Sequence, residues 1–176
     1  MTHIALLRGI NVGGKNILPM KELAALFQEH GAKQVKTYIQ SGNVVFRTEI
    51  DPDEIARQVE AQILERFAIT TPIILRTAEE LDFALRNNPF VARGEEEGLY
   101  VLFLKHMPTP EAVAALDPLR SPPDEFLVQR REVFMRLLSA ATTKLTNAYF
   151  DSKLKTVGTA RNWRTVATLC EMASTL

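Results

Sequence analysis

The chain has 176 residues, of which 46% are hydrophobic and 24% charged, and this composition is typical of a globular protein with a packed core. No apolar run approaches the length of a membrane-spanning helix, and no basic region with a following apolar stretch opens the sequence. We therefore expect a cytoplasmic protein with no membrane partner. The formal net charge is zero, which argues against a general nucleic-acid binder.

Cysteine and histidine give no sign of a bound metal. Cys170 is the only cysteine, so it cannot form an internal disulfide. The three histidines His3, His30 and His106 lie far apart and lack the spacing of metal ligands. The sequence therefore predicts no structural metal and no cofactor.

The zero net charge hides an uneven distribution along the chain. Residues 1–47 carry a net charge of +4, residues 48–143 of −7 and residues 144–176 of +3. If both ends meet in the fold, they form a positive surface. Ordinary fluctuation of charge along a chain explains the pattern as well.

The first half alternates strand and helix signals. The periodicity predicts strands at 3–8, 34–40, 44–46 and 71–76, and helices at 19–30 and 51–67. Asp51 can cap the second helix with its side chain, and Pro52 suits the first helical position that follows it. The order β-α-β-β-α-β is that of a ferredoxin-like (split βαβ, α/β-plait) unit, which we place at residues 1–77.

The second half repeats much of this order. After a helix at 77–88 and an exposed charged connection ending at 98, we expect a strand at 99–104, a helix at 109–116, a hairpin of 125–129 with 132–137, and helices at 143–154 and 162–172. The sequence therefore predicts an α+β protein with two ferredoxin-like units in tandem and a C-terminal helix. The domain boundaries we expect are 1–77, 78–98 and 99–176.

A glycine-rich loop follows the first strand. Gly9, Gly13 and Gly14 let backbone N–H groups turn toward an anion. The spacing Gly-x-x-x-x-Gly-Lys matches the start of a P-loop, but Asn16 stands where the magnesium-binding hydroxyl belongs, and the element order provides no parallel sheet. The sequence is consistent with both an anion-binding loop and a simple wide turn.

The hairpin turn Tyr38 to Asn43 is the second candidate. In strand periodicity Tyr38 and Gln40 share a face, so their polar ends could reach one ligand. In the predicted topology Asn43 lies near the end of the first strand, which brings this turn to the glycine loop. Ser, Gly and Asn are all favoured in tight turns, so Ser41-Gly42-Asn43 is also explained without any ligand.

The basic segment 153–165 is the third candidate. Lys155, Arg161 and Arg164 lie just before or within the start of the last helix. Positive charges at a helix start interact unfavourably with the helix dipole unless a bound anion neutralises them. Asn162 or Thr159 could cap this helix. A solvated basic turn is the alternative interpretation.

Three motifs together resemble a known family. Leu6-Leu7-Arg8-Gly9-Ile10-Asn11-Val12-Gly13-Gly14, Tyr38-Ile39-Gln40-Ser41-Gly42-Asn43-Val44 and Thr159-Ala160-Arg161-Asn162-Trp163-Arg164-Thr165-Val166 are similar to the bacterial family of unknown function numbered 1697. The resemblance spans the chain and implies two α/β-plait units. It implies no activity.

The leading hypothesis is a binding protein for a small anionic, phosphate-bearing or nucleotide-like ligand. The predicted site consists of Arg8, Gly9, Asn11, Gly13, Gly14, Lys15, Tyr38, Gln40, Ser41, Asn43, Lys155, Arg161 and Asn162. An enzyme that uses this site, with Tyr38 or Lys155 as proton donor, is one alternative. Nucleic-acid binding on a plait sheet is a less favoured one, because only Tyr38 and Phe46 are aromatic in the strands of the first half.

Overall fold

The protein divides into two compact units. The structure, a computed structural model, describes all residues 1–176. The first unit comprises residues 1–82 and 168–176, and the second comprises residues 83–167. Each has a four-stranded antiparallel sheet, which confirms the predicted α+β class. The predicted division gave all of 99–176 to the second half, whereas the end of the chain belongs to the first unit.

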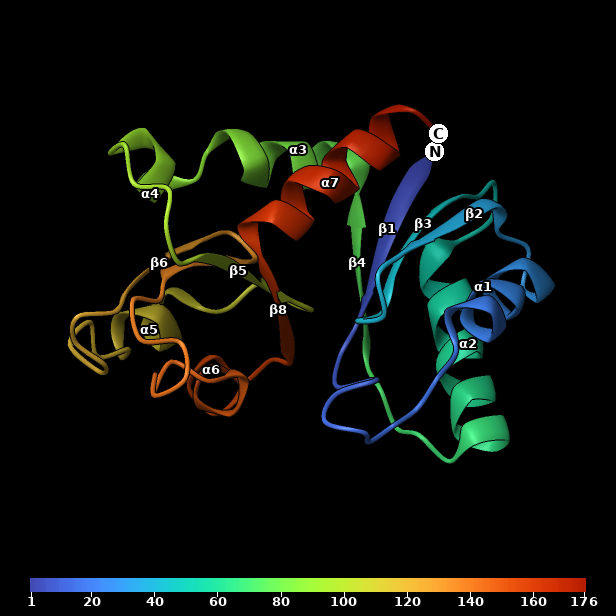
Figure 1. Cartoon of the computed structure of the whole chain (residues 1–176), viewed down its shortest axis with the longest axis horizontal. Helices are drawn as coiled ribbons and strands as arrows, with labels where there is room; N and C mark the ends of the chain where they lie inside the picture. The colour runs from blue at the N-terminus through green and yellow to red at the C-terminus, as the bar shows by residue number, and fades with distance from the viewer. The chain divides into compact units, whose positions relative to one another are not determined.

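The first unit has the predicted order of elements (Figure 1). They are β1 (Thr2–Leu7), α1 (Met20–Glu29), β2 (Lys33–Tyr38), β3 (Asn43–Arg47), α2 (Pro52–Phe67) and β4 (Ile73–Thr77), followed by α3 (Ala78–Arg86). The strand order in the sheet is β2-β3-β1-β4, with every neighbouring pair antiparallel. Helices α1 and α2 cover one face of this sheet.

Burial on both faces explains why β1 is apolar without alternation. Ala5 and Leu7 join the core beneath α1 and α2, and Ile4 and Leu6 on the opposite face are also fully buried. The start of α2 follows the prediction, since Asp51 accepts a hydrogen bond from the Asp53 N–H at 3.0 Å.

The second unit repeats this topology. Its elements are α4 (Pro89–Ala92), β5 (Leu99–Leu104), α5 (Pro110–Ala114), β6 (Glu125–Gln129), β7 (Glu132–Arg136), α6 (Asn147–Leu154) and β8 (Gly158–Asn162). Helix α7 (Trp163–Ser174) begins in this unit, and its residues from 168 onward belong to the first unit. The strand order is β6-β7-β5-β8, again antiparallel throughout. A core that includes Leu102, Val133 and Phe150 lies between the sheet and its helices.

Two local predictions differ from the structure of this unit. Residues 158–162, to which no strand was assigned, form β8 and pair with β5. Helix α6 begins at Asn147 rather than at residue 143, because the Thr146 side chain caps it. The helix predicted at 77–88 ends at Arg86 as α3, and Asn88 caps α4 by accepting from the Phe90 N–H at 2.9 Å.

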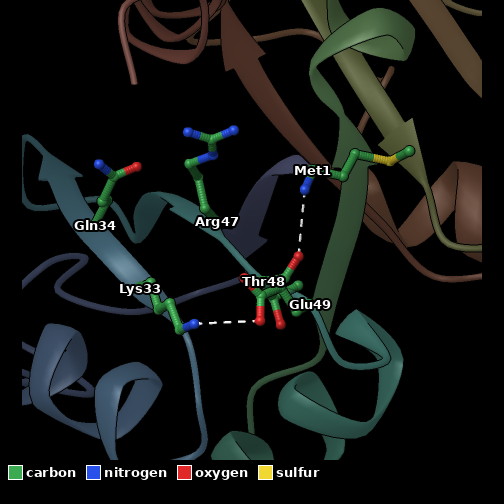
Figure 2. A pocket seen from close by; sticks show the side chains of 6 residues that line it. All are labelled: Met1, Lys33, Gln34, Arg47, Thr48 and Glu49. Atoms are coloured by element: carbon green, nitrogen blue, oxygen red, sulfur yellow. Dashed lines mark hydrogen bonds and ion pairs between the residues drawn. The ribbon is translucent and has the colours of Figure 1, made fainter.

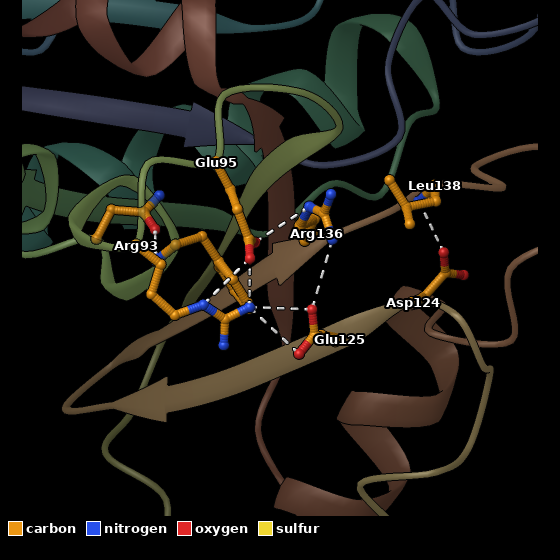
Figure 3. A network of polar contacts seen from close by, with 8 residues as sticks. Arg93, Glu95, Asp124, Glu125, Arg136 and Leu138 are labelled. Atoms are coloured by element: carbon orange, nitrogen blue, oxygen red, sulfur yellow. Dashed lines mark hydrogen bonds and ion pairs between the residues drawn. The ribbon is translucent and has the colours of Figure 1, made fainter.

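The charged connection before β5 is fixed to the sheet by four side chains (Figure 3). Arg93 Nη2 lies 2.7 Å from Glu95 Oε1 and 3.1 Å from Glu125 Oε2. Arg136 Nε lies 3.1 Å from Glu95 Oε2. Two guanidinium groups thus balance two carboxylates, and this network has no excess charge to offer a ligand.

Candidate functional site

The tip of the glycine loop is a two-residue hairpin. The Lys15 N–H donates to the Val12 carbonyl at 3.0 Å, and Gly13 and Gly14 both have positive φ, of 58° and 73°. This is the type I′ turn that suits two-residue hairpins. Anion-binding nests instead alternate right-handed and left-handed residues. The N–H groups of Gly13 and Gly14 donate to no group of the chain, but the turn does not make them converge as a nest would.

Two asparagine side chains hold the loop in place. Asn11 Nδ2 donates to the Leu18 carbonyl at 2.9 Å and to the Gln40 carbonyl at 2.7 Å. Asn16 Nδ2 donates to the Gly9 carbonyl at 2.8 Å. The bond between Asn11 and Gln40 confirms the predicted meeting of the glycine loop with the turn between β2 and β3.

In that turn the side chains serve mainly the turn itself. Asn43 is fully buried, and its Nδ2 donates to the Tyr38 carbonyl at 3.1 Å and to Ser41 Oγ at 2.9 Å. Strand β2 ends at Tyr38, so Gln40 lies in the turn and does not share a strand face with Tyr38, contrary to the prediction. Both hydrogen bonds of the Asn43 amide nitrogen are therefore made within the turn.

The two cations of the glycine loop differ in their surroundings. Arg8 is half-buried, and its backbone N–H and carbonyl both bond to Thr71 Oγ1, at 3.2 and 2.7 Å. Lys15 is exposed, and its side chain makes no ion pair within the chain. Of the predicted cations in the first unit, Lys15 is the one available to a ligand from solvent.

Arg161 is not the helix-start cation that we predicted. It lies in β8 opposite Val101, is 7% exposed, and its Nη1 donates to Thr159 Oγ1 at 2.8 Å and to the Ala160 carbonyl at 2.9 Å. Burial lowers the pKa of Arg161 to about 10. Asn162 is the cap of α7, as predicted, since its Oδ1 accepts from the Thr165 N–H at 2.8 Å. Both side chains therefore support the fold, and Arg161 is not an unpaired cation at a helix start.

Lys155 lines a hollow of about 430 Å³ in the second unit. The segment that joins β5 to α5, helix α5, and the end of α6 with its following residues form it. Its lining includes His106, Met107, Glu111, Ala112, Lys153, Leu154, Lys155 and Thr156. The Thr156 hydroxyl accepts a hydrogen bond from the backbone N–H of His106 at 3.1 Å and so joins two of these segments.

The charges of this hollow are not balanced within the chain. The side chains of Lys153, Lys155 and His106 are exposed and make no ion pair or hydrogen bond with the chain, and Glu111 is the one carboxylate in the lining. Lysines at a helix C-terminus also complement the helix dipole, which offers a structural reason for Lys153 and Lys155. That reason does not extend to His106.

The hollow and the glycine loop occupy the same topological position in their respective units. The glycine loop belongs to the connection from β1 to α1, residues 8–19. His106 and Met107 of the hollow belong to the connection from β5 to α5, residues 105–109. The second helix ends at a left-handed residue in both, Ala68 with φ 53° and Lys155 with φ 55°. His106 and Lys153 are not among the site residues predicted from the sequence. Alignment of the two halves by element order is the signal that could have found His106.

Two other hollows are weaker candidates. One of about 390 Å³ lies near the start of the chain, but there Lys33 is paired with Glu49 at 3.3 Å, and the Met1 amine donates to the Thr48 carbonyl at 3.3 Å (Figure 2). Another, of about 360 Å³, borders the balanced network of Arg93 and Glu125. The structure contains no cluster of His, Cys, Asp or Glu side chains arranged to hold a metal ion. It also has no helix with the length and apolarity needed to cross a membrane.

Comparison with known proteins gives a family and a fold. A family described as "Protein of unknown function (DUF1697)" matches residues 1–134. The solved structure of the conserved bacterial protein SP0830 from Streptococcus pneumoniae is similar over 98% of both chains, with a TM-score of 0.69 and 21% sequence identity. At this identity the likeness shows the fold alone. No curated protein matches the sequence.

Proposed function

The chain belongs to DUF1697, a family of proteins of unknown function, and we propose that it is a cytoplasmic protein that binds a small phosphate-bearing or nucleotide-like anion in the hollow around Lys155. The observation that carries the proposal is the set of three unpaired basic side chains, Lys153, Lys155 and His106, along one hollow that contains a single carboxylate. Lysine ammonium groups bind phosphate as strong point charges.

Electrostatics favours an anion over a neutral ligand here. Unpaired like charges that line one concave surface raise the local concentration of counter-ions, and a bound anion removes their mutual repulsion. Lys15 on the glycine loop is a second candidate contact for an anion, supported by its unpaired side chain and by the absence of any Asp or Glu in residues 1–21.

Thermal unfolding with added ligand tests the proposal. A ligand at ten times its dissociation constant stabilises a protein by about 1.4 kcal/mol, which raises the Tm by about 3–5 °C for a chain of this length. We expect such a shift from phosphate monoesters or nucleotides, and a shift reduced by half or more in Lys155→Ala. Absence of a shift with every phosphate compound would contradict the proposal.

The chain offers matched controls for this experiment. Lys144 is an exposed, unpaired lysine of the second unit that does not line the hollow, so Lys144→Ala removes the same charge elsewhere. Lys15→Ala tests the glycine loop separately. Equal loss of the shift in Lys144→Ala and Lys155→Ala would show non-specific attraction of anions.

An enzyme that uses the same hollow is the second candidate function. His106 and Glu111 line it together, and both residue types serve as general acids and bases. Turnover of a bound phosphate ester that is lost in His106→Ala, while the ligand still binds, would favour this alternative.

Nucleic-acid binding has less support. A plait sheet that binds RNA stacks bases on exposed aromatic side chains of its central strands. Phe46 in β3 is fully buried and packs against Phe27, with ring centroids 5.1 Å apart. Filter binding at two salt concentrations tests the alternative, because phosphate-backbone binding weakens steeply as salt rises.

We also propose that both units are ferredoxin-like repeats. Both have the strand order 2-3-1-4 when strands are numbered within the unit. Arg76 and Arg161 each occupy the fourth residue of the fourth strand, are buried, and donate from Nη1 to the preceding residue's carbonyl. The next residue, Thr77 or Asn162, accepts from the N–H three positions later and so caps the following helix.

A further inference from the structure

The lining of the Lys155 hollow combines basic and apolar side chains. Lys153, Lys155 and His106 are exposed, and Ala112 in the same lining is half-buried. The hollow therefore offers both basic groups and apolar surface to a ligand.

Met107 adds an adaptable apolar wall. Met107 is 61% exposed although it lines the hollow. Methionine has three rotatable side-chain bonds and a polarizable sulfur, so it can fold against a ligand of variable shape.

The size of the hollow exceeds what a bare phosphate ion fills. A volume of about 430 Å³ falls within the range of about 300–1,000 Å³ for sites of small organic molecules. An inorganic anion on the lysines would leave Ala112 and Met107 in contact with water. A ligand that also covers this apolar surface gains the hydrophobic contribution of the area it buries.

We propose that the ligand is an amphiphilic anion: a phosphate monoester whose phosphate contacts Lys153, Lys155 and His106 and whose organic part is apolar and packs on Ala112 and Met107. This inference rests on the proposed function and adds the class of ligand. It separates esters with an aromatic or aliphatic body from inorganic phosphate and from esters with a fully polar body.

Titration followed by NMR of the ¹⁵N-labelled full chain tests the class. The probes are inorganic phosphate, glycerol 3-phosphate and phenyl phosphate. We expect phenyl phosphate to bind at least tenfold more tightly than the other two, with the largest shifts at residues 106–107, 112 and 154–156. The variant Lys153→Ala/Lys155→Ala is expected to weaken all three probes.

Two substitutions on α5 isolate the apolar wall. Ala112→Leu fills part of the hollow, whereas Ala114→Leu places the same side chain on an exposed position outside it. We expect Ala112→Leu to reduce the preference for phenyl phosphate over inorganic phosphate at least fivefold, and Ala114→Leu to leave the preference intact. Both variants keep the lysines, so inorganic phosphate reports that the charged part is still formed.

The outcomes separate the two proposals. If inorganic phosphate and phenyl phosphate bind the hollow equally well, the ligand class is wrong while the proposed function stands. If no probe binds, both fail. A preference for phenyl phosphate that Ala112→Leu leaves unchanged, or shifts that map to another surface, would also overturn the ligand class.

Discussion

Asn11 Nδ2 lies 2.7 Å from the carbonyl oxygen of Gln40, so one side chain joins the glycine loop to the turn between β2 and β3. The same nitrogen also donates to the Leu18 carbonyl, and Asn11 Oδ1 accepts from the Leu18 N–H at 2.8 Å. One asparagine therefore closes the base of the loop and attaches it to its neighbour.

Removal of this side chain is expected to loosen the loop. Asn11 has φ 53°, so Asn11→Gly keeps the backbone conformation and loses only the hydrogen bonds, at a cost of about 1–2 kcal/mol. Asn11→Ala adds the cost of a left-handed non-glycine residue, about 1 kcal/mol more. Urea denaturation measures both, and hydrogen exchange should show faster exchange across residues 8–19. An Asn11→Gly variant as stable as the parent, with unchanged exchange, would contradict this role.

Gly42 is expected to tolerate no side chain. Its φ is +80°, and a Cβ there would lie 2.7 Å from Leu7 Cβ and 2.9 Å from Ile10 Cδ1. Gly42→Ala therefore combines backbone strain with overpacking, and we expect a loss of about 2–4 kcal/mol in the free energy of unfolding.

Gly13→Ala provides the matched control for Gly42→Ala. Gly13 also has a positive φ, of +58°, but nothing lies within 4 Å of its Cβ position, so we expect a loss of about 1 kcal/mol from strain alone. The difference between the two variants in urea denaturation measures the steric part. Equal losses would mean that the contact with Leu7 and Ile10 relaxes freely.

The sequence predicts the elements that carry a local signal. Apolar periodicity located α1, and an Asp-Pro pair located the start of α2, where Asp51 is the cap. The adjacency of the glycine loop and the 38–43 turn followed from strand order alone, and the bond from Asn11 to Gln40 bears it out.

The missed strand β8 has no such local signal. Its sequence Gly-Thr-Ala-Arg-Asn is polar and contains no β-branched apolar residue, so its extended form depends on pairing with β5. The error about Arg161 has the same origin, because a buried arginine in a strand and an exposed arginine at a helix start look alike in sequence. The hollow around Lys155 was missed because His106 and Lys153 are far apart in the chain and meet only in the fold.

We expect Lys155 to lower the free energy of unfolding slightly while it contributes its positive charge to the hollow. Its φ of 55° is a conformation that favours glycine at the end of a helix. Lys155→Gly relieves about 1 kcal/mol of strain and loses a few tenths of a kcal/mol of interaction with the helix dipole, so we expect a net gain of about 0.5 kcal/mol in stability. The proposed function predicts that the same variant binds phosphate monoesters more weakly.

Ala68→Gly is the control at the matching helix end of the first unit. Ala68 has φ 53° and carries no charge, so its replacement should stabilise the protein by a similar amount and leave ligand binding unchanged. Thermal unfolding and ligand titration of both variants give the comparison. A Lys155→Gly variant that binds phosphate as tightly as the parent would remove Lys155 from the site.

Asp124 is expected to make stability depend on pH in the acid range. Burial alone would raise the pKa of Asp124, but hydrogen bonds from the Thr143 hydroxyl and from the backbone N–H groups of Leu138 and Ser139 outweigh burial, so its pKa is lowered. Figure 3 shows the bond from Leu138, at 2.8 Å. Because the unfolded chain binds the proton more readily, the contribution of this carboxylate is fully present above pH 4 and is lost as the pH falls through the lowered pKa.

Asp124→Asn tests this linkage. At pH 7 we expect the variant to be less stable by about 1–3 kcal/mol, because a neutral amide accepts the two N–H groups less strongly. The difference from the parent should shrink as the pH falls below about 4, where the parent carboxylate becomes protonated. Glu96→Gln removes an exposed carboxylate that has no partner in the chain, so its effect on urea denaturation should be small at every pH. A stability difference between the parent and Asp124→Asn that stays constant from pH 7 to pH 2 would mean that the charge of Asp124 is not what holds the segment at Leu138 and Ser139.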